Sequence, residues 1–219
     1  HARLLEDGTL LRAYGSPNGQ TPSALKAGLF QIVDWDGEVV WEYENPRKGY
    51  SAHHDFRMIW NPKLEERTIM YTTSREISHE EAIALGVDPE LRENYASSPD
   101  GLIEIDLKGN IIWEWNITDH LVQDVNPDSS NYGVIKEHPE KLDPNFGTGV
   151  SRDWIHMNSF DFNETLDHIV INNSVFSEFY VIDHGATFLA GDPEGSVALA
   201  AGKAGDFIYR WGNSCVYDS

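Results

Sequence analysis

Cysteine, positive charge and long apolar runs are all scarce in this sequence. Its one cysteine, Cys215, excludes a disulfide within the 219 residues and leaves the redox compartment open. Only 16 Lys and Arg stand against 36 Asp and Glu, and the net charge of -20 repels phosphate backbones and anionic membranes. No apolar run approaches the roughly 18 residues that a membrane helix needs. We therefore expect no nucleic-acid partner and no membrane span.

The sequence does not begin with Met, and its first residues do not have the charged-then-apolar pattern of a signal peptide. It opens at His1 with residues typical of a strand and a turn, so we expect this N-terminus to be mature, processed or the start of a fragment. Hydrophobic residues make up 40% of the chain, which is enough for a substantial core. We predict a single domain over residues 1–219.

One short pattern, a strand followed by a turn and a second strand, occurs three times. Residues 32–43 and 103–115 each contain a glycine, Gly37 or Gly109, where a tight hairpin needs a positive φ. Residues 204–211 repeat the pattern more faintly. Two further strand-like runs precede each copy, so the repeating unit has four strands.

Repeated four-stranded units are typical of a β-propeller. We predict an all-β fold of about three four-stranded antiparallel blades of such a propeller. The blades are expected at about 1–45, 51–117 and 152–212. A β-sandwich is the alternative, but a sandwich gives no reason for a four-stranded pattern that restarts each time with histidine.

Two segments interrupt the predicted strands. A helical insertion is expected at 78–95, where Ser78 and Glu81 have the spacing of a capping box. A long loop rich in Pro, Asp, Asn and Gly is expected at 118–151. Both would lie outside the repeated strands.

Histidines open the first strand of each predicted blade, and first strands line the channel of a propeller. We therefore expect His1, His54 with His53 beside it, and His156 to meet at one mouth of the channel. Imidazole can act as nucleophile, general base or metal ligand, although each ring could instead satisfy a hydrogen bond in the core. Asn158 shares a face with His156 because strand side chains alternate, and it either orients a substrate oxygen or caps a turn.

We predict no metal ion and no other cofactor. Three histidines are ligands that zinc or copper favours, but no spacing motif such as H-E-x-x-H supports a metal site. Residues 124–128 resemble the start of a calcium loop, yet Ile135 stands where that loop needs its glutamate.

Several segments together resemble the arylsulfotransferase family. They are His53–Phe56, Asp119–Pro127 with Asn131–Gly133, Asp153–Ser159, Phe179–His184 and Tyr209–Asn213. The resemblance implies a six-bladed propeller, of which the three predicted blades make half. It also implies a periplasmic or extracellular protein that moves a sulfuryl group from an aryl sulfate to a phenol without a nucleotide donor. It also implies that one channel histidine is transiently sulfated.

The resemblance assigns roles to particular residues. His53, His54 and His156 match catalytic histidines of the family, and Asn158 matches a substrate contact. Ser174 stands where an arginine that binds the sulfate is usual, and a neutral hydroxyl cannot provide the charged fork of a guanidinium.

Two further observations bear on activity. Arg152 and Arg210 are the candidate substitutes for the arginine that Ser174 replaces. The family's sulfated histidine belongs to a Gln-His motif downstream of residues 209–213, and this sequence ends before it.

Two functions follow, and the sequence leaves open whether this chain is an enzyme. The first is an arylsulfotransferase acting on an aryl sulfate and a phenol. The alternative is a non-catalytic propeller used as a binding or structural module at a cell surface. In both cases we expect missing blades from the rest of the chain or from a second polypeptide, because half a ring exposes large apolar faces.

Overall fold

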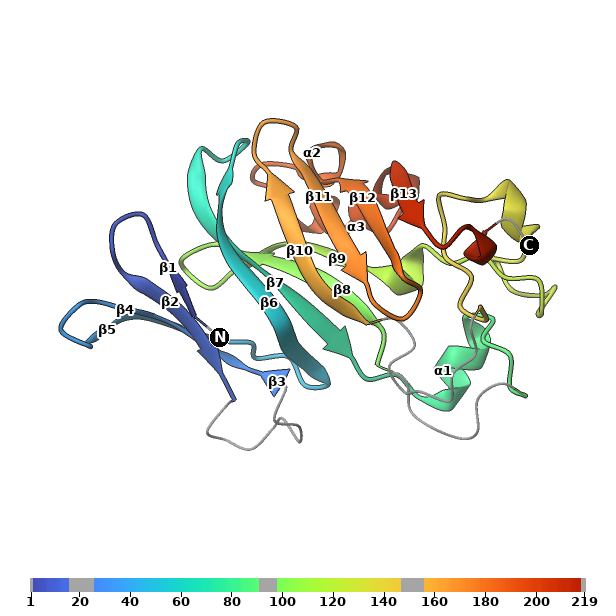
Figure 1. Cartoon of the computed structure of the whole chain (residues 1–219), viewed down its shortest axis with the longest axis horizontal. Coiled ribbons are helices and arrows are strands. Elements are labelled where there is room, and N and C mark those ends of the chain that lie inside the picture. The colour runs from blue at the N-terminus through green and yellow to red at the C-terminus, as the bar shows by residue number, and fades with distance from the viewer. Residues whose placement is uncertain (1, 16–25, 91–97, 147–155, 218–219) are drawn as a thin grey trace.

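The computed structural model describes residues 2–15, 26–90, 98–146 and 156–217. Within these ranges the strands form three antiparallel sheets that follow one another along the chain, from β1 at one end to β13 at the other (Figure 1). The prediction of an all-β chain built from antiparallel, blade-like sheets is confirmed.

Each sheet keeps its strands almost in chain order. Sheet 1 has the order β1 (Ala2–Leu4), β2 (Leu10–Tyr14), β4 (Leu29–Val33), β5 (Val39–Glu44). Sheet 2 has the order β3 (Lys26–Ala27), β6 (Tyr50–Asn61), β7 (Glu66–Arg75), β8 (Asp100–Ile105), β9 (Ile111–Asn116). Sheet 3 has the order β10 (Met157–Asn163), β11 (His168–Asn173), β12 (Glu178–Asp183), β13 (Tyr209–Gly212). The short strand β3 is the one exception, because it leaves sheet 1 to pair with β6.

Burial shows that sheet 2 is covered on both faces. Every residue of β8 is buried, whereas β11 in sheet 3 alternates between buried and more exposed positions. A strand whose two faces are both covered has buried side chains on both faces. In a strand with one open face, buried and exposed side chains alternate along the chain. Sheet 2 is therefore the middle layer of the described structure.

Two apolar clusters fill the spaces beside sheet 2. The cluster shared with sheet 1 includes Leu11, Phe30, Tyr43, Phe56, Ile69, Tyr71 and Ile103. The cluster shared with sheet 3 includes Met70, Leu102, Trp113, Trp115, Phe160, Ile171 and Tyr180. These clusters hold the three sheets in fixed relative positions, because burying such side chains removes large apolar areas from water.

The helices are short and lie between strands. The capping box predicted at Ser78 and Glu81 is present, and it begins α1 (His79–Ala84). Single-turn 3-10 helices cover Ile117–Asp119, Ile135–Glu137, Lys203–Gly205 and Ser214–Val216. None of the helices in the described ranges is long and apolar enough to cross a membrane.

Of the hairpin predicted at 204–211, the second strand is present as β13, which pairs with β12 as the fourth strand of sheet 3, but the first strand is absent. In its place the chain leaves β12 through α2 (His184–Thr187) and α3 (Pro193–Ala200), and only β13 forms a strand. Helix α3 packs against β9 of sheet 2. Gly205 lets the chain pass close to the C-terminal end of α3, because a Cβ there would lie 2.0 Å from the carbonyl oxygen of Ala200.

Candidate functional site

Three of the predicted histidines meet where β6 of sheet 2 faces β10 of sheet 3. The ring centroid of His54 lies 4.5 Å from that of His156, and the His53 centroid lies 5.3 Å from His54 and 6.1 Å from His156. His53 and His54 belong to β6, and His156 immediately precedes β10. Residues about 100 positions apart in the sequence thus form one cluster. His1, the fourth predicted member, lies outside the described residues.

A β-bulge in β6 places His54. Pairing between β6 and β7 stops at Ala52 and Thr73 and resumes at Phe56 and Tyr71, so three residues stand opposite the single residue Thr72. His54, the middle one, has φ +48°, which is uncommon for a residue other than glycine. Bulges of this kind redirect a side chain away from the regular alternation of a strand, and they are frequent beside functional sites.

The hydroxyl of Thr72 fills the bulge. It donates to the carbonyl oxygen of His53 and lies 3.2 Å from both the backbone nitrogen and the carbonyl oxygen of Asp55. Thr72 is fully buried, so these contacts replace the backbone pairing that the bulge removes. The conformation of His54 is therefore fixed from the neighbouring strand.

Asn158 sits in a second bulge, in β10. Met157 pairs with Asn173 and Ser159 pairs with Asn172, which leaves Asn158 as the extra residue. Its side-chain oxygen Oδ1 is buried and has no hydrogen-bond partner among the described residues. A buried acceptor without a donor is costly, and a hydroxyl donor from a ligand would remove that cost.

Ser174 lies beside His156, as the antiparallel pairing of β10 and β11 predicts. Its backbone N–H donates to the carbonyl oxygen of His156 at 3.1 Å, and its hydroxyl oxygen lies 3.4 Å from the same atom. The position next to His156 is therefore occupied by an exposed, neutral side chain.

Arg210 is held away from solvent in a buried ion pair. Its Nε donates to Glu178 Oε1 at 3.0 Å and its second terminal nitrogen to Oε2 at 2.6 Å, while the first terminal nitrogen contacts the carbonyl oxygens of Pro139 and Lys141. Fixed in this way, the guanidinium anchors β13 to β12 and to the preceding loop. We therefore leave Arg210 out of the proposed site; Arg152, the other candidate, lies outside the described residues.

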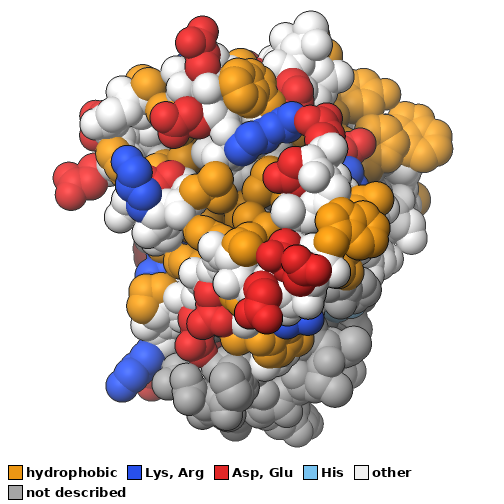
Figure 2. Space-filling view, turned by 90° about the vertical axis from the view of Figure 1, so that its left-hand side faces the viewer, with side chains coloured by type: hydrophobic (Ala, Val, Ile, Leu, Met, Phe, Trp, Pro, Cys, Tyr) orange, Lys and Arg blue, Asp and Glu red, His pale blue; other side chains and the backbone are white. Residues whose placement is uncertain are grey.

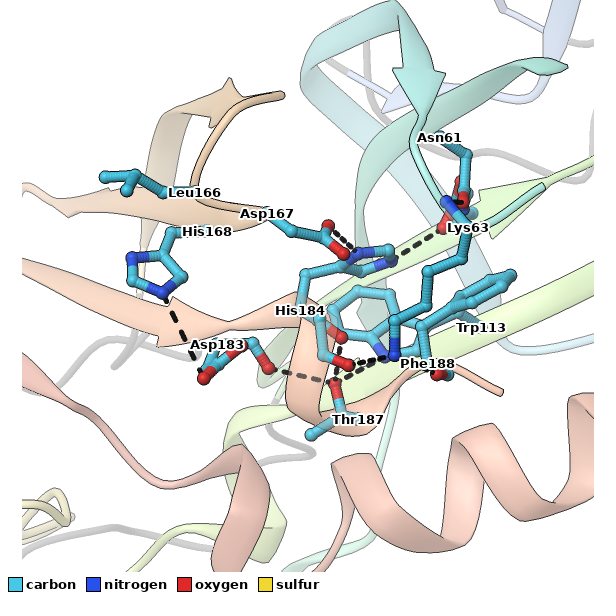
Figure 3. Close-up of polar contacts among 12 residues, drawn as sticks. Asn61, Lys63, Trp113, Leu166, Asp167, His168, Asp183, His184, Thr187 and Phe188 are labelled. Atoms are coloured by element: carbon cyan, nitrogen blue, oxygen red, sulfur yellow. Dashed lines mark hydrogen bonds and ion pairs between the residues drawn. The ribbon is translucent and has the colours of Figure 1, made fainter. Parts of the chain in front are cut away.

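A further histidine, His184, is fully buried and was not assigned a role from the sequence. Its Nδ1 lies 2.6 Å from Asp167 Oδ1 and its Nε2 lies 2.9 Å from Glu104 Oε2, so the ring joins sheet 3 to sheet 2 (Figure 3). Burial alone lowers the pKa of His184, but hydrogen bonds and charge from Asp167 and Glu104 outweigh it and raise that pKa to about 9.

The surroundings of His184 are structural. Lys63 Nζ donates to the carbonyl oxygen of Phe188 at 2.8 Å and also to that of Gly185, and Trp113 Nε1 donates to Thr187 Oγ1 at 3.0 Å (Figure 3). Every polar group here is directed at another protein group. The signal that could have identified this cluster is a charged residue, Glu104, between Ile103 and Ile105 in a strand that is buried throughout.

Within the described ranges no group of three or more His, Cys, Asp or Glu is arranged to hold a metal ion. Near neutral pH, imidazole groups can bind an anion through their N–H groups and can move a proton.

Comparison with known proteins identifies one family. The sequence profile of the family described as "Arylsulfotransferase (ASST)" matches residues 57–195, more than half of the chain. No curated protein matches the sequence. Among solved structures, the chain is similar to Kuenenia stuttgartiensis hydrazine synthase at 12% identity and a TM-score of 0.45, covering 97% of this chain and 49% of that one. The chain thus spans about half the length of that protein.

Proposed function

The chain belongs to the arylsulfotransferase family, and we propose that it transfers a sulfuryl group from an aryl sulfate to a phenol at the cluster of His53, His54 and His156. The observation that carries the proposal is the 4.5 Å separation of the His54 and His156 rings, which come from different sheets. A site assembled from two sheets presents several imidazole nitrogens to one small ligand.

The chemistry needs groups that hold a sulfate and move one proton. The bond between sulfur and the donor's aryl oxygen breaks and a bond between sulfur and the acceptor's phenolic oxygen forms, while the proton lost by the acceptor is gained by the departing aryl oxygen. Imidazole carries such a proton because its ordinary pKa is near 6.5. Imidazole N–H groups also stabilise negative charge on the sulfuryl oxygens as the transition state forms.

Asn158 supplies a second kind of contact. A phenolic hydroxyl is a hydrogen-bond donor, and the buried Oδ1 of Asn158 is an acceptor that lacks one among the described residues. Asn158 follows His156 by two positions, so it would orient the acceptor phenol next to the imidazole that takes its proton.

The direct test is to incubate the purified protein with 4-nitrophenyl sulfate and a phenol and to measure both released nitrophenol and sulfated product. We expect transfer that falls to the background rate in His156→Ala. The matched control is His138→Ala, because His138 is a partly exposed histidine in the loop before β10 whose ring bonds to nearby Glu140. No transfer to any phenol by the folded protein would refute the proposal.

A non-catalytic binding module is the second candidate, and Ser174 favours it. A sulfate beside His156 would meet a hydroxyl at this position instead of a guanidinium, so its charge would be less well neutralised. The two functions differ in one observable: a binding module would retain aryl sulfate, detected by calorimetry, without releasing the phenol.

Further sheets would complete either form of the protein. The outward face of sheet 1 exposes 69% of Leu4, 59% of Val40 and 40% of Tyr14, and its surface mixes apolar with charged side chains (Figure 2). We propose that additional blades, from a longer chain or a second polypeptide, cover this face outside the cytoplasm. A native mass of 24.7 kDa for a soluble, active species would argue against it.

A further inference from the structure

Two buried carboxylates of sheet 2 bind the edge strand of sheet 3. Asp100 Oδ2 accepts a hydrogen bond from the backbone N–H of Met157 at 2.6 Å, and Asp55 Oδ2 accepts one from the backbone N–H of Phe160 at 3.2 Å. The strand β10 is at the edge of its sheet, so these N–H groups face away from β11. The carboxylates take the place of a partner strand there.

The same carboxylates contact the histidine segment of β6. Asp100 Oδ1 lies 3.0 Å from His53 Nε2, within the distance of an ion pair. Asp55 follows His54 directly, and its Oδ1 accepts from the backbone N–H of Phe56 at 2.9 Å and from the guanidinium of Arg3. We call Asp55 and Asp100 the carboxylate clamp.

The clamp acts where regular strand pairing is missing. His54 lies in the bulge of β6 and Asn158 lies in the bulge of β10, so the ladders to β7 and β11 are interrupted at both positions. The two N–H groups that the clamp binds flank Asn158 on its own strand. Displacing the reacting groups of an active site by about 1 Å can lower the rate by about 100-fold. The clamp therefore controls the distances from His54 to His156 and Asn158, on which the rate of transfer depends.

We propose that Asp55 and Asp100 are positioning residues that hold His54 against His156 and Asn158. This inference rests on the sulfuryl transfer proposed above. Neither carboxylate needs to touch the substrate. Each acts by fixing the backbone that carries an imidazole or an amide of the site.

Substitution by asparagine is the sharpest test, because it keeps the size of the side chain and replaces one acceptor oxygen by an NH₂ donor. In Asp55→Asn and Asp100→Asn we expect kcat for 4-nitrophenyl sulfate to fall about 10- to 100-fold, with KM changed less than about twofold. The control is Asp161→Asn on β10, the strand that the clamp binds. The Asp161 carboxylate is largely exposed and bonds to Arg57 at 2.8 Å. Its kinetic constants should stay within about twofold of the unaltered protein.

A second readout does not depend on turnover. Ring protons of His54 and His156 should give a nuclear Overhauser effect in the unaltered protein and in Asp161→Asn, and this signal should be lost in both clamp variants. Loss of the signal supports the clamp even when no transfer is observed, in which case the proposed function alone has failed. A retained signal, or unchanged kcat, in both clamp variants would overturn the inference.

If the clamp variants do not fold, amide hydrogen exchange of the unaltered protein tests the clamp instead. The backbone amides of Met157 and Phe160 should exchange slowly, since their acceptors are buried carboxylates. Fast exchange of both amides, at the rate of unprotected edge positions, would show that the clamp does not hold β10.

Discussion

The ring of His184 lies between the carboxylates of Glu104 and Asp167, with Nε2 2.9 Å from the first and Nδ1 2.6 Å from the second. Glu104 and His184 are fully buried. Glu104 also accepts from Asn61 at 2.9 Å and from Thr68 at 2.5 Å, so its charge is compensated by donors on all sides. A protonated His184 therefore stabilises the contact between sheets 2 and 3.

This arrangement predicts a pH dependence of stability. The pKa of His184 is raised from 6.5 to about 9 in the folded protein, so the folded state binds the proton more tightly than the unfolded state. The resulting stabilisation is fully present below pH 6.5 and is lost as the pH rises to about 9. The difference in free energy of unfolding between the unaltered protein and His184→Gln should shrink over that range in urea titrations. A difference that stays constant from pH 6 to pH 9.5 would contradict the assignment.

The repeated hairpins could be predicted because local sequence determines them. Gly37 and Gly109 have φ +86° in the turns where the pattern required a positive φ. Helix α3 was missed although Asp192 and Pro193 form an N-cap and first helical position of the usual kind. Sheet 3 has the four strands predicted for residues 152–212, but the helices between β12 and β13 were not predicted, and α3 is held there by its packing on β9.

For the candidate site, the sequence predicts which histidines come together but not the contacts that hold them in place. That His54 and His156 converge follows from repeat topology, and the sequence carries that topology. The roles of Asp55, Asp100 and Thr72 depend on bulges and on contacts between sheets, which no local pattern reports. Buried polar side chains of this kind are recognised only when their partners are known.

Thr72 provides a test of the bulge. Thr72→Val keeps the shape of the side chain and removes the hydroxyl that contacts His53 and Asp55. We expect a loss of about 1–3 kcal/mol in the free energy of unfolding, because a buried N–H of the bulge loses its acceptor. Sulfuryl transfer should also slow in protein that remains folded.

The control for this variant is Thr73→Val on the same strand. Thr73 is equally buried, but its hydroxyl makes a single contact, to the carbonyl oxygen of Ser51 at 3.3 Å. It should cost about 1 kcal/mol or less and leave the transfer rate unchanged. Equal losses in the two variants would show that the bulge has no special dependence on Thr72.

Ser174→Arg should increase activity. A guanidinium placed beside His156 would form charged hydrogen bonds to a sulfate, each worth about 1.5–3 kcal/mol, so kcat/KM should rise about 10- to 100-fold. The control is Val175→Arg, which adds the same charge at the next, half-exposed position. A similar increase in both variants would indicate that long-range attraction of the anionic substrate is the cause.

Substitution of Arg210 tests whether this residue has a structural role or binds the sulfate of the substrate. Its side chain is 3% exposed and that of its partner Glu178 is fully buried, so Arg210→Met leaves an uncompensated carboxylate in the interior. We expect this variant to lose about 3–5 kcal/mol of stability in urea titrations. The double variant Arg210→Met with Glu178→Met should recover most of the loss, because it removes both charges and keeps apolar volume against Tyr180 and Phe207.

If the double variant is stable and its KM for 4-nitrophenyl sulfate is unchanged, Arg210 has no part in binding sulfate. A KM raised 10-fold or more in that stable protein would instead return Arg210 to the site as an anion-binding residue.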